Sequence, residues 1–247
     1  MNGSPPNPES PFDPSTLPER IRSVRARIEA AARRARRGPS KIRLIAVSKG
    51  QPAAAIQTAF SEGLREFGEN YLEEALPKIL LLPPDAVWHM IGHVQSRKAK
   101  STAENFSWVH SVDSAELARR LSRFAVEAGR TIRVLLECNL SGETTKYGWS
   151  ASDPSAWETL WPAWREILQL PGLSVAGLMT MAPYSDDPET ARPVFRNLKR
   201  LQAAAREAVP DSDWAELSMG MSDDFEQAVE EGATMVRIGR ALFGERR

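Results

Sequence analysis

This chain has few of the residues on which disulfides and membrane spans depend. It contains one cysteine, Cys138, so no internal disulfide can form, which is compatible with a reducing cytoplasm. No apolar run reaches the roughly 20 residues that a membrane-spanning helix needs. The 32 basic residues balance the 32 acidic residues, so no net charge attracts nucleic acid or a membrane surface. We therefore expect a cytoplasmic protein with no nucleic-acid or membrane partner.

Histidine is scarce as well. Two of the three histidines, His89 and His93, have the H-x-x-x-H spacing that places two metal ligands together on a helix. They fall in strand-like sequence, however, where residues four apart lie roughly 13 Å from each other. No cluster of carboxylates or thiols joins them, so we expect no catalytic metal.

Two local features have ordinary structural explanations. Cys138 lies in the apolar run 132–140 and is expected to be a small core residue. The basic cluster at residues 33–37 is expected at the solvated end of a helix, where cations complement the C-terminal dipole.

The first 16 residues differ in composition from the rest of the chain. They are rich in Pro, Ser and Asn, and they lack the basic-then-apolar order of a signal peptide. We predict a disordered tail over 1–16. No Pro/Gly-rich linker interrupts residues 40–247, so 17–247 is predicted to be one domain. The chain length is typical of a single (β/α)8 barrel.

Strand-like and helix-like segments alternate along the predicted domain. An amphipathic helix over 17–37 comes first, and each later strand is followed by helical sequence. Several strands are apolar throughout, as strands buried on both faces are. Eight such units favour a closed (β/α)8 TIM barrel with an extra N-terminal helix, although periodicity alone leaves an open doubly wound sheet as the alternative. The predicted strands are 42–47, 64–67, 87–91, 108–111, 132–140, 173–179, 214–217 and 234–238.

Lys49 directly follows the first predicted strand. In a barrel, the residues just past the strand ends form the active face. Burial there can lower the pKa of a lysine and make its amine a nucleophile. Taken alone, an ordinary surface lysine would be the simpler interpretation, but two later loops offer what a phosphorylated aldehyde needs.

Those loops follow the seventh and eighth predicted strands, which form the usual phosphate site of barrel proteins. Ser218 offers a hydroxyl donor, and Gly220 permits close approach of the backbone. Gly239 opens a short terminal helix, whose free N–H groups favour an anion. The alternative is that both glycines serve tight turns. A lysine amine and a phosphate site together suggest pyridoxal 5′-phosphate (PLP), which carries an aldehyde and a phosphate.

Arg237 lies on the last predicted strand. If its side chain points into the barrel, the guanidinium needs an acceptor, and a pyridine nitrogen would serve. Because arginine always donates, that nitrogen would stay unprotonated, which weakens the ring as an electron sink. The alternative is a structural ion pair with a carboxylate at a strand end.

Three further residues lie at strand ends. His93 is expected to line the mouth of the site or to have its ring nitrogens hydrogen-bonded to backbone groups. Asn70 can line the site and also cap the helix that starts at Tyr71, and the cap alone is the simpler explanation. Met179 could touch a ring, and core packing explains it equally well.

The ordered segments of this chain resemble the PLP homeostasis protein family. They extend from about residue 40 to the end and occur in the family's order. Eight segments in order are far more specific than any single one. The matching segments are 46–49 (AVSK), 67–71 (FGENY), 88–96 (WHMIGHVQS), 109–114 (VHSVDS), 139–143 (NLSGE), 177–180 (GLMT), 217–222 (LSMGMS) and 236–239 (VRIG).

The resemblance implies a barrel like the N-terminal domain of alanine racemase, with PLP held as an aldimine on Lys49. It also implies that Arg237 faces the ring nitrogen. The remaining cofactor-binding residues that it implies are phosphate contacts from Ser218, Met219, Gly239 and Arg240, and wall residues Asn70, His93 and Met179.

The chain departs from the family pattern in two places. Arg240 occupies a position where the family usually has a small hydroxyl residue, so a hydroxyl contact to phosphate is lost and a charge could replace it. Gly50-Gln51 replaces a common Thr-Lys, which puts any role of a second lysine there in doubt. Lys146 matches a family lysine of unclear role.

We weigh three functions. The favoured one is a non-catalytic PLP binder in intracellular PLP homeostasis, which stores or buffers the cofactor, or delivers it to client enzymes. The second is a small PLP-dependent amino-acid racemase, which is disfavoured because no tyrosine base is evident and no β-domain follows Arg247. The third is a phosphate-binding barrel without PLP. No exposed apolar stripe requires a partner, so we expect a monomer.

Overall fold

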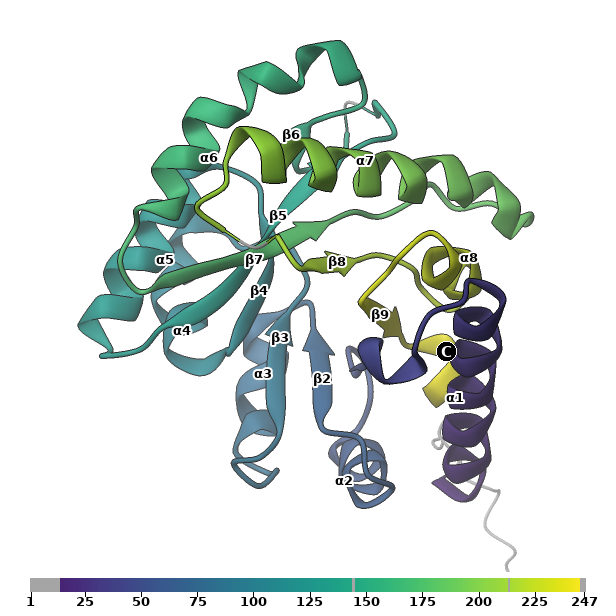
Figure 1. Cartoon of the computed structure of the whole chain (residues 1–247). Helices are drawn as coiled ribbons and strands as arrows, with labels where there is room; N and C mark the ends of the chain where they lie inside the picture. Colours follow the sequence, from purple (N-terminus) through teal and green to yellow (C-terminus); the bar gives the residue numbers. More distant parts are fainter. Residues whose placement is uncertain (1–13, 144, 213, 245–247) are drawn as a thin grey trace, which may run out of the picture.

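The computed structural model describes residues 14–143, 145–212 and 214–244. Its parallel strands close into a barrel in the order β4-β3-β2-β1-β9-β8-β7-β5, and pairing of β4 with β5 completes the ring (Figure 1). The closed barrel predicted from the sequence is therefore confirmed. The barrel strands are β1 (Arg43–Val47), β2 (Glu66–Glu69), β3 (Val87–Met90), β4 (Trp108–Val112), β5 (Ile132–Asn139), β7 (Leu173–Met179), β8 (Glu216–Ser218) and β9 (Met235–Ile238).

One strand was not predicted. The two-residue β6 (Trp149–Ser150) pairs with the last residues of β5 outside the ring. It is too short to give a sequence pattern, because alternation of apolar and polar residues needs at least four residues to be recognised.

Helices surround the barrel. Within the described residues, none of them is long and apolar enough to cross a membrane. They are α1 (Leu17–Arg34), α2 (Ala53–Ser61), α3 (Leu72–Ile79), α4 (Ala99–Asn105), α5 (Ala115–Glu127), α6 (Trp161–Leu168), α7 (Arg192–Ala208), α8 (Phe225–Glu230) and α9 (Arg240–Phe243).

Three of the predicted helices begin as a turn of 3-10 helix. Two of these turns, Pro154–Thr159 and Pro188–Ala191, have a proline in the first position and an aspartate before it. The carboxylates of Asp153 and Asp187 each accept a hydrogen bond from the backbone N–H two residues later, which tightens the first turn. The helical sequence that we expected after the fifth and sixth predicted strands therefore begins with these turns, which precede α6 and α7.

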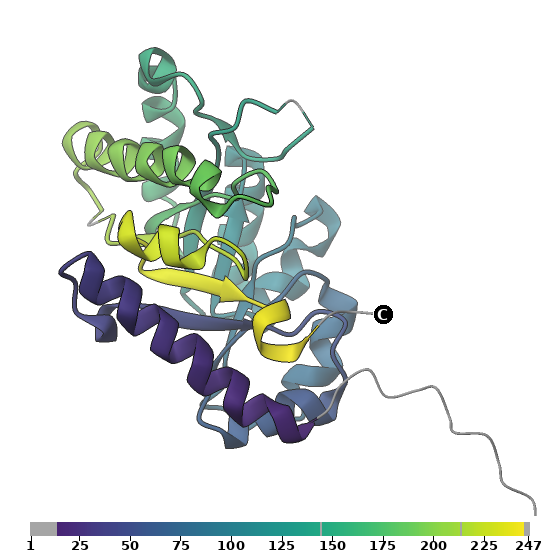
Figure 2. The same cartoon turned by 90° about the vertical axis from the view of Figure 1, so that its right-hand side faces the viewer.

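The extra N-terminal helix α1 is anchored on the outside of the barrel beside α8 and α9 (Figure 2). Arg34 binds the carboxylates of Glu226 at 2.8 Å and Glu230 at 2.6 Å, and Arg37 donates to the carbonyl of Val229 at 2.6 Å. The basic cluster is thus more than a solvated helix end, because part of it attaches α1 to α8. Residues 1–13 of the predicted tail lie outside the described residues, and Pro14–Thr16 forms a 3-10 turn that leads into α1.

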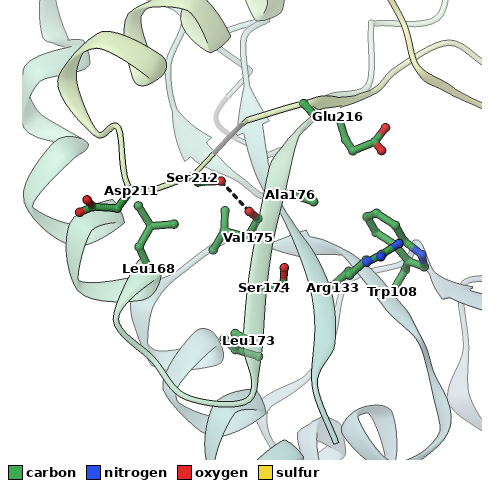
Figure 3. Close-up of a pocket in the computed structure, with 11 residues that line it drawn as sticks. Trp108, Arg133, Leu168, Leu173, Ser174, Val175, Ala176, Asp211, Ser212 and Glu216 are labelled. Carbon is green, nitrogen blue, oxygen red and sulfur yellow. Dashed lines mark hydrogen bonds between the residues drawn. The ribbon is translucent and has the colours of Figure 1, made fainter. Parts of the chain in front are cut away.

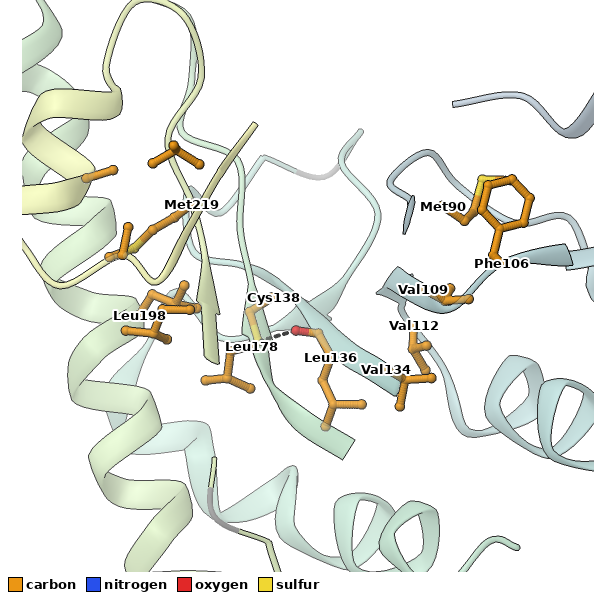
Figure 4. Close-up of a cluster of buried hydrophobic side chains, with 14 of the residues drawn as sticks. Met90, Phe106, Val109, Val112, Val134, Leu136, Cys138, Leu178, Leu198 and Met219 are labelled. Carbon is orange, nitrogen blue, oxygen red and sulfur yellow. Dashed lines mark hydrogen bonds between the residues drawn. The ribbon is translucent and has the colours of Figure 1, made fainter. Parts of the chain in front are cut away.

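The apolar core has two layers, which explains the apolar character of the strands. Ile45, Leu135 and Met179 belong to a cluster inside the barrel, whereas Ala46 belongs to the cluster between the strands and the helices. Figure 4 shows part of this outer cluster, with Cys138 among its members. Cys138 is buried there, as the sequence predicted, and burial raises the pKa of its thiol.

Candidate functional site

Lys49 follows β1 at the carboxyl ends of the strands. Lys49 lies in the turn two residues past the last residue of β1, Val47. Lys49 is half-buried. The residue therefore lies at the end of the barrel where the strands terminate.

The peptide groups on both sides of Lys49 are held by α3. The ammonium of Lys78 donates to the carbonyl of Ser48 at 2.8 Å, and the N–H of Gly50 donates to the carboxylate of Glu74. Lys78 also binds Glu74 at 2.5 Å. Lys49 therefore stands on a segment that is fixed from two directions.

A buried carboxylate completes this clamp. Glu69 accepts hydrogen bonds from the Ser48 hydroxyl and from Lys78, each at 2.7 Å. Its other oxygen is buried without a hydrogen-bond partner, and burial raises the pKa of this carboxyl. Sequence analysis missed these residues; the only available signal was the i, i+4 spacing of Glu74 and Lys78 on a predicted helix.

Arg237 is buried, with 4% of its surface exposed. Its guanidinium donates to the Ser218 hydroxyl at 2.6 Å and to the carbonyl of Thr180 at 3.0 Å. No carboxylate within the described ranges forms an ion pair with it, so the structural ion pair that we considered is not found. Burial lowers the pKa of Arg237 to about 10, against the nearby charges of Asp224 and Glu137, so it stays protonated at neutral pH. Two of its five N–H groups are used, and the rest can serve a ligand.

Ser218 and Met219 lie deeper than a surface phosphate loop would place them. The Ser218 hydroxyl is fully buried between Arg237 and His110, whose Nδ1 lies 2.9 Å away. The side chain of Met219 faces outward into the core beside Leu198 (Figure 4). Any contact of Met219 with a ligand would therefore come from its backbone.

The start of α9 has the groups that an anion requires. Gly239 precedes the helix, and the Ser222 hydroxyl accepts a hydrogen bond from the backbone N–H of Ala241 at 3.2 Å. The guanidinium of Arg240 pairs with Asp223, so its charge is balanced locally. Ser222 was absent from the predicted ligands, although the segment 217–222 contained it. The sequence did not show that Ser222 lies beside α9, because the two loops approach each other only in the folded barrel.

The two glycines of these loops differ in what they require. Gly220 has φ +92°, and a Cβ there would lie 2.5 Å from the Cβ of Ala228, so a tight turn against α8 explains this glycine. At Gly239 a Cβ would lie 3.5 Å from the Cβ of Val47, an ordinary contact. The turn alternative therefore explains Gly220, whereas the packing around Gly239 does not require glycine.

The predicted wall residues lie at or just past the carboxyl ends of β2, β3 and β7. His93 binds the carboxylate of Asp113 at 3.1 Å and stacks on Tyr147 with a ring separation of 3.8 Å, so it is satisfied by side chains rather than by backbone. Asn70 and His93 line the same cavity of about 320 Å³. The expected helix cap by Asn70 is wrong, because Tyr71 precedes α3 and no side chain caps it. Met179 is fully buried inside the barrel.

The described part of the chain contains no group of three or more His, Cys, Asp or Glu that could hold a metal ion. A second cavity, of about 570 Å³, opens at the other end of the barrel, where Arg133 lies over the ring of Trp108 (Figure 3). Most of its lining comes from the first residues of β4, β5, β7 and β8, so it is remote from the loops after the strands. Activity in this fold resides at the carboxyl ends of the strands, which favours the mouth near Lys49.

Glu137 is a buried carboxyl on β5 with no hydrogen bond to another described side chain. Burial and the charge of Asp113 raise its pKa to about 7, although Arg237 opposes them. An acid that titrates near neutrality in the mouth can accept or donate a hydrogen bond to a ligand.

Replacing Glu137 by glutamine should stabilise the protein above neutral pH. The folded pKa of about 7 exceeds the ordinary 4.5, so the free energy of unfolding falls as pH rises between these values. We expect Glu137→Gln to add up to about 3 kcal/mol near pH 8 and little near pH 4. Urea unfolding at both pH values measures this. The exposed Glu143→Gln is the control, and an equal gain at both pH values for Glu137→Gln would contradict the expectation.

A family model and curated relatives both match nearly the whole chain. The family model described as the alanine racemase N-terminal domain matches residues 20–247. A pyridoxal phosphate homeostasis protein of Pseudomonas aeruginosa is 44% identical over 236 residues, covering 94% of this chain and 96% of its own length.

Solved structures show the same similarity. PipY of Synechococcus elongatus, solved with PLP bound, has a TM-score of 0.79 at 38% identity, covering 92% of this chain and 100% of PipY. An alanine racemase of Clostridium difficile has a TM-score of 0.70 at 15% identity, covering 92% of this chain and 57% of its own. The second comparison bears on the fold alone.

Proposed function

This chain belongs to the pyridoxal phosphate homeostasis protein family, and from that membership and the geometry of the mouth we propose that it binds PLP. In this proposal the protein stores, buffers or delivers the cofactor inside the cell and does not turn over amino acids. The observation that carries the proposal is the fixed backbone on both sides of Lys49, at the same end of the barrel as Arg237 and the start of α9.

The residues of the mouth fit the chemical groups of PLP. The amine of Lys49 would hold the aldehyde, and the cofactor when bound supplies an electron-withdrawing ring. The Ser222 hydroxyl and the backbone N–H groups of Gly239 and Arg240 would hold the phosphate.

Arg237 would donate to the ring nitrogen, and Ser218 would hold Arg237 in place. The remaining proposed contacts are the walls Asn70, His93 and Met179 and the backbone of Met219.

The proposal of a non-catalytic binder rests on the character of Arg237 and on the tyrosines. A guanidinium donor keeps the ring nitrogen unprotonated, so the ring is a weak electron sink. Tyr71, Tyr147 and Tyr184 are all exposed, and Tyr147 is stacked on His93. None is a buried base beside Lys49. A racemase would exchange the α-proton of amino acids with solvent at a steady rate, and holoprotein that does so in D₂O would overturn this part of the proposal.

The visible spectrum of purified protein with added PLP tests the binding itself. We expect a band near about 420 nm, as general PLP chemistry gives for a cofactor joined to lysine, and borohydride should abolish it and fix the added mass on Lys49. A barrel that binds only phosphate would show no such band. Absence of the band and of the added mass would refute PLP binding through Lys49.

The proposal includes a cytoplasmic monomer that passes PLP to client enzymes. Sedimentation of apo- and holoprotein tests the monomer. Transfer of PLP to an apoenzyme that is separated by a dialysis membrane distinguishes simple release from delivery by contact.

A further inference from the structure

A chain of hydrogen bonds crosses the inside of the barrel and ends at Arg237. Arg237 donates to the Ser218 hydroxyl at 2.6 Å, and Ser218 lies 2.9 Å from Nδ1 of His110. Nε2 of His110 lies 2.9 Å from Nδ1 of His89, and Nε2 of His89 lies 2.5 Å from the carboxylate of Glu66. The chain therefore joins the mouth to the opposite end of the barrel, where β2 begins.

The position of every proton in this hydrogen-bond chain follows from its last link when both rings are neutral. The carboxylate of Glu66 can only accept, so His89 carries its proton on Nε2 and accepts at Nδ1 from Nε2 of His110. The Nδ1 of His110 then accepts the proton of the Ser218 hydroxyl. Arg237 can only donate, so the Ser218 oxygen accepts from it. All four hydrogen bonds run in one direction, from the guanidinium to the carboxylate.

The charges agree with this assignment. Both histidines are fully buried, and burial lowers the pKa of His89 and lowers that of His110 well below its ordinary value, so both rings are neutral. Burial acts to raise the pKa of Glu66, but the hydrogen bond from His89 and the charges of Arg43 and Arg133 hold it below its ordinary value. The hydrogen-bond chain therefore has a cation, Arg237, at one end and an anion, Glu66, at the other, and the groups between them are uncharged.

We propose that Glu66, His89 and His110 are positioning residues for Arg237. Because His110 takes the Ser218 proton, the serine oxygen is fixed as an acceptor toward Arg237. With the carbonyl of Thr180 as the second acceptor, at 3.0 Å, the plane of the guanidinium is set. This inference rests on the proposed function, in which that guanidinium faces the ring nitrogen of PLP.

The proton assignment is tested first in protein without PLP. The protein contains only three histidines, so labelling histidine with ¹⁵N gives a resolvable spectrum. We expect His89 and His110 to be neutral at pH 7, each protonated on Nε2 alone. A proton on Nδ1 of either ring, or a charged ring, would overturn the assignment, and His89→Gln and His110→Gln assign the signals.

The positioning role is tested by removing the far end of the chain. Glu66→Leu leaves His89 without an acceptor, and we expect PLP to be released about five- to tenfold faster, the loss typical of one hydrogen bond between uncharged groups, because the effect on Arg237 is indirect. Glu66→Gln keeps a carbonyl acceptor for His89 and should restore wild-type release.

Glu216→Leu is the matched control. Glu216 is a carboxylate at the same end of the barrel, with 22% of its side chain exposed against 23% for Glu66, but it binds Arg43 and the Thr234 hydroxyl instead of the chain. Its charge reaches His89 only through space, without a hydrogen bond to the hydrogen-bond chain, so we expect the release rate to stay within about twofold of wild type.

Wild-type release from folded Glu66→Leu, or equal acceleration in Glu216→Leu, would refute the positioning role. If Glu66→Leu does not fold, the histidine spectrum of the wild-type protein still decides the proton assignment. If the wild-type protein takes up no PLP while its histidines carry the expected protons, the proposed function fails and the hydrogen-bond chain stands.

Discussion

Replacing Lys49 by alanine is expected to abolish the covalent attachment of PLP while the barrel stays folded. The clamp on this segment consists of the Ser48 carbonyl, the Gly50 N–H and the side chains of Lys78 and Glu74, none of which belongs to Lys49. The variant should therefore keep its free energy of unfolding within about 1 kcal/mol of wild type. Its visible spectrum should lack the band of the bound cofactor, and borohydride should fix no added mass.

Lys98→Ala is a suitable control for that experiment. Lys98 lines the cavity that contains Asn70 and His93 and is paired with Glu73 at 2.7 Å, so it offers a second amine near the mouth. It should retain the band and the added mass on Lys49. A wild-type band in Lys49→Ala would exclude Lys49 as the attachment point, and loss of the band in Lys98→Ala alone would move the attachment to that residue.

Replacing Arg237 by alanine should weaken PLP retention about ten- to hundredfold. One hydrogen bond to a charged group contributes roughly 1.5–3 kcal/mol, and about 1.4 kcal/mol corresponds to a factor of ten. Arg237→Lys should lie between wild type and Arg237→Ala, since lysine keeps the charge but not the fork that reaches both Ser218 and Thr180. The dissociation constant and the release rate measure both variants.

Stability must be followed in the same variants, because Arg237→Ala leaves the buried Ser218 hydroxyl and Thr180 carbonyl without a donor. Thermal unfolding gives the loss of stability, and PLP retention is compared at temperatures where each variant is folded. Arg123→Ala removes an exposed arginine of α5 and should leave retention unchanged. Unchanged retention in folded Arg237→Ala would argue against a contact with the ring.

The sequence was sufficient for the features that depend on neighbouring residues. Strands buried on both faces, such as 132–139, produce apolar runs that differ from the amphipathic pattern of α1, and their alternation predicted the barrel. Lys49 could be placed at the mouth because it directly follows a strand. The loops at 217–222 and 236–240 were recognised from their residue types and from the family resemblance.

Only the tertiary structure decided which side chains meet. His110 and Ser218 are 108 residues apart along the chain, and they touch because barrel closure brings β4 and β8 to face each other across the interior. The same closure turned Ser218 toward Arg237 and left Ser222 beside the start of α9. Strand periodicity specifies the face on which a side chain lies, but the partner across a barrel depends on strand order and register, which no local pattern contains.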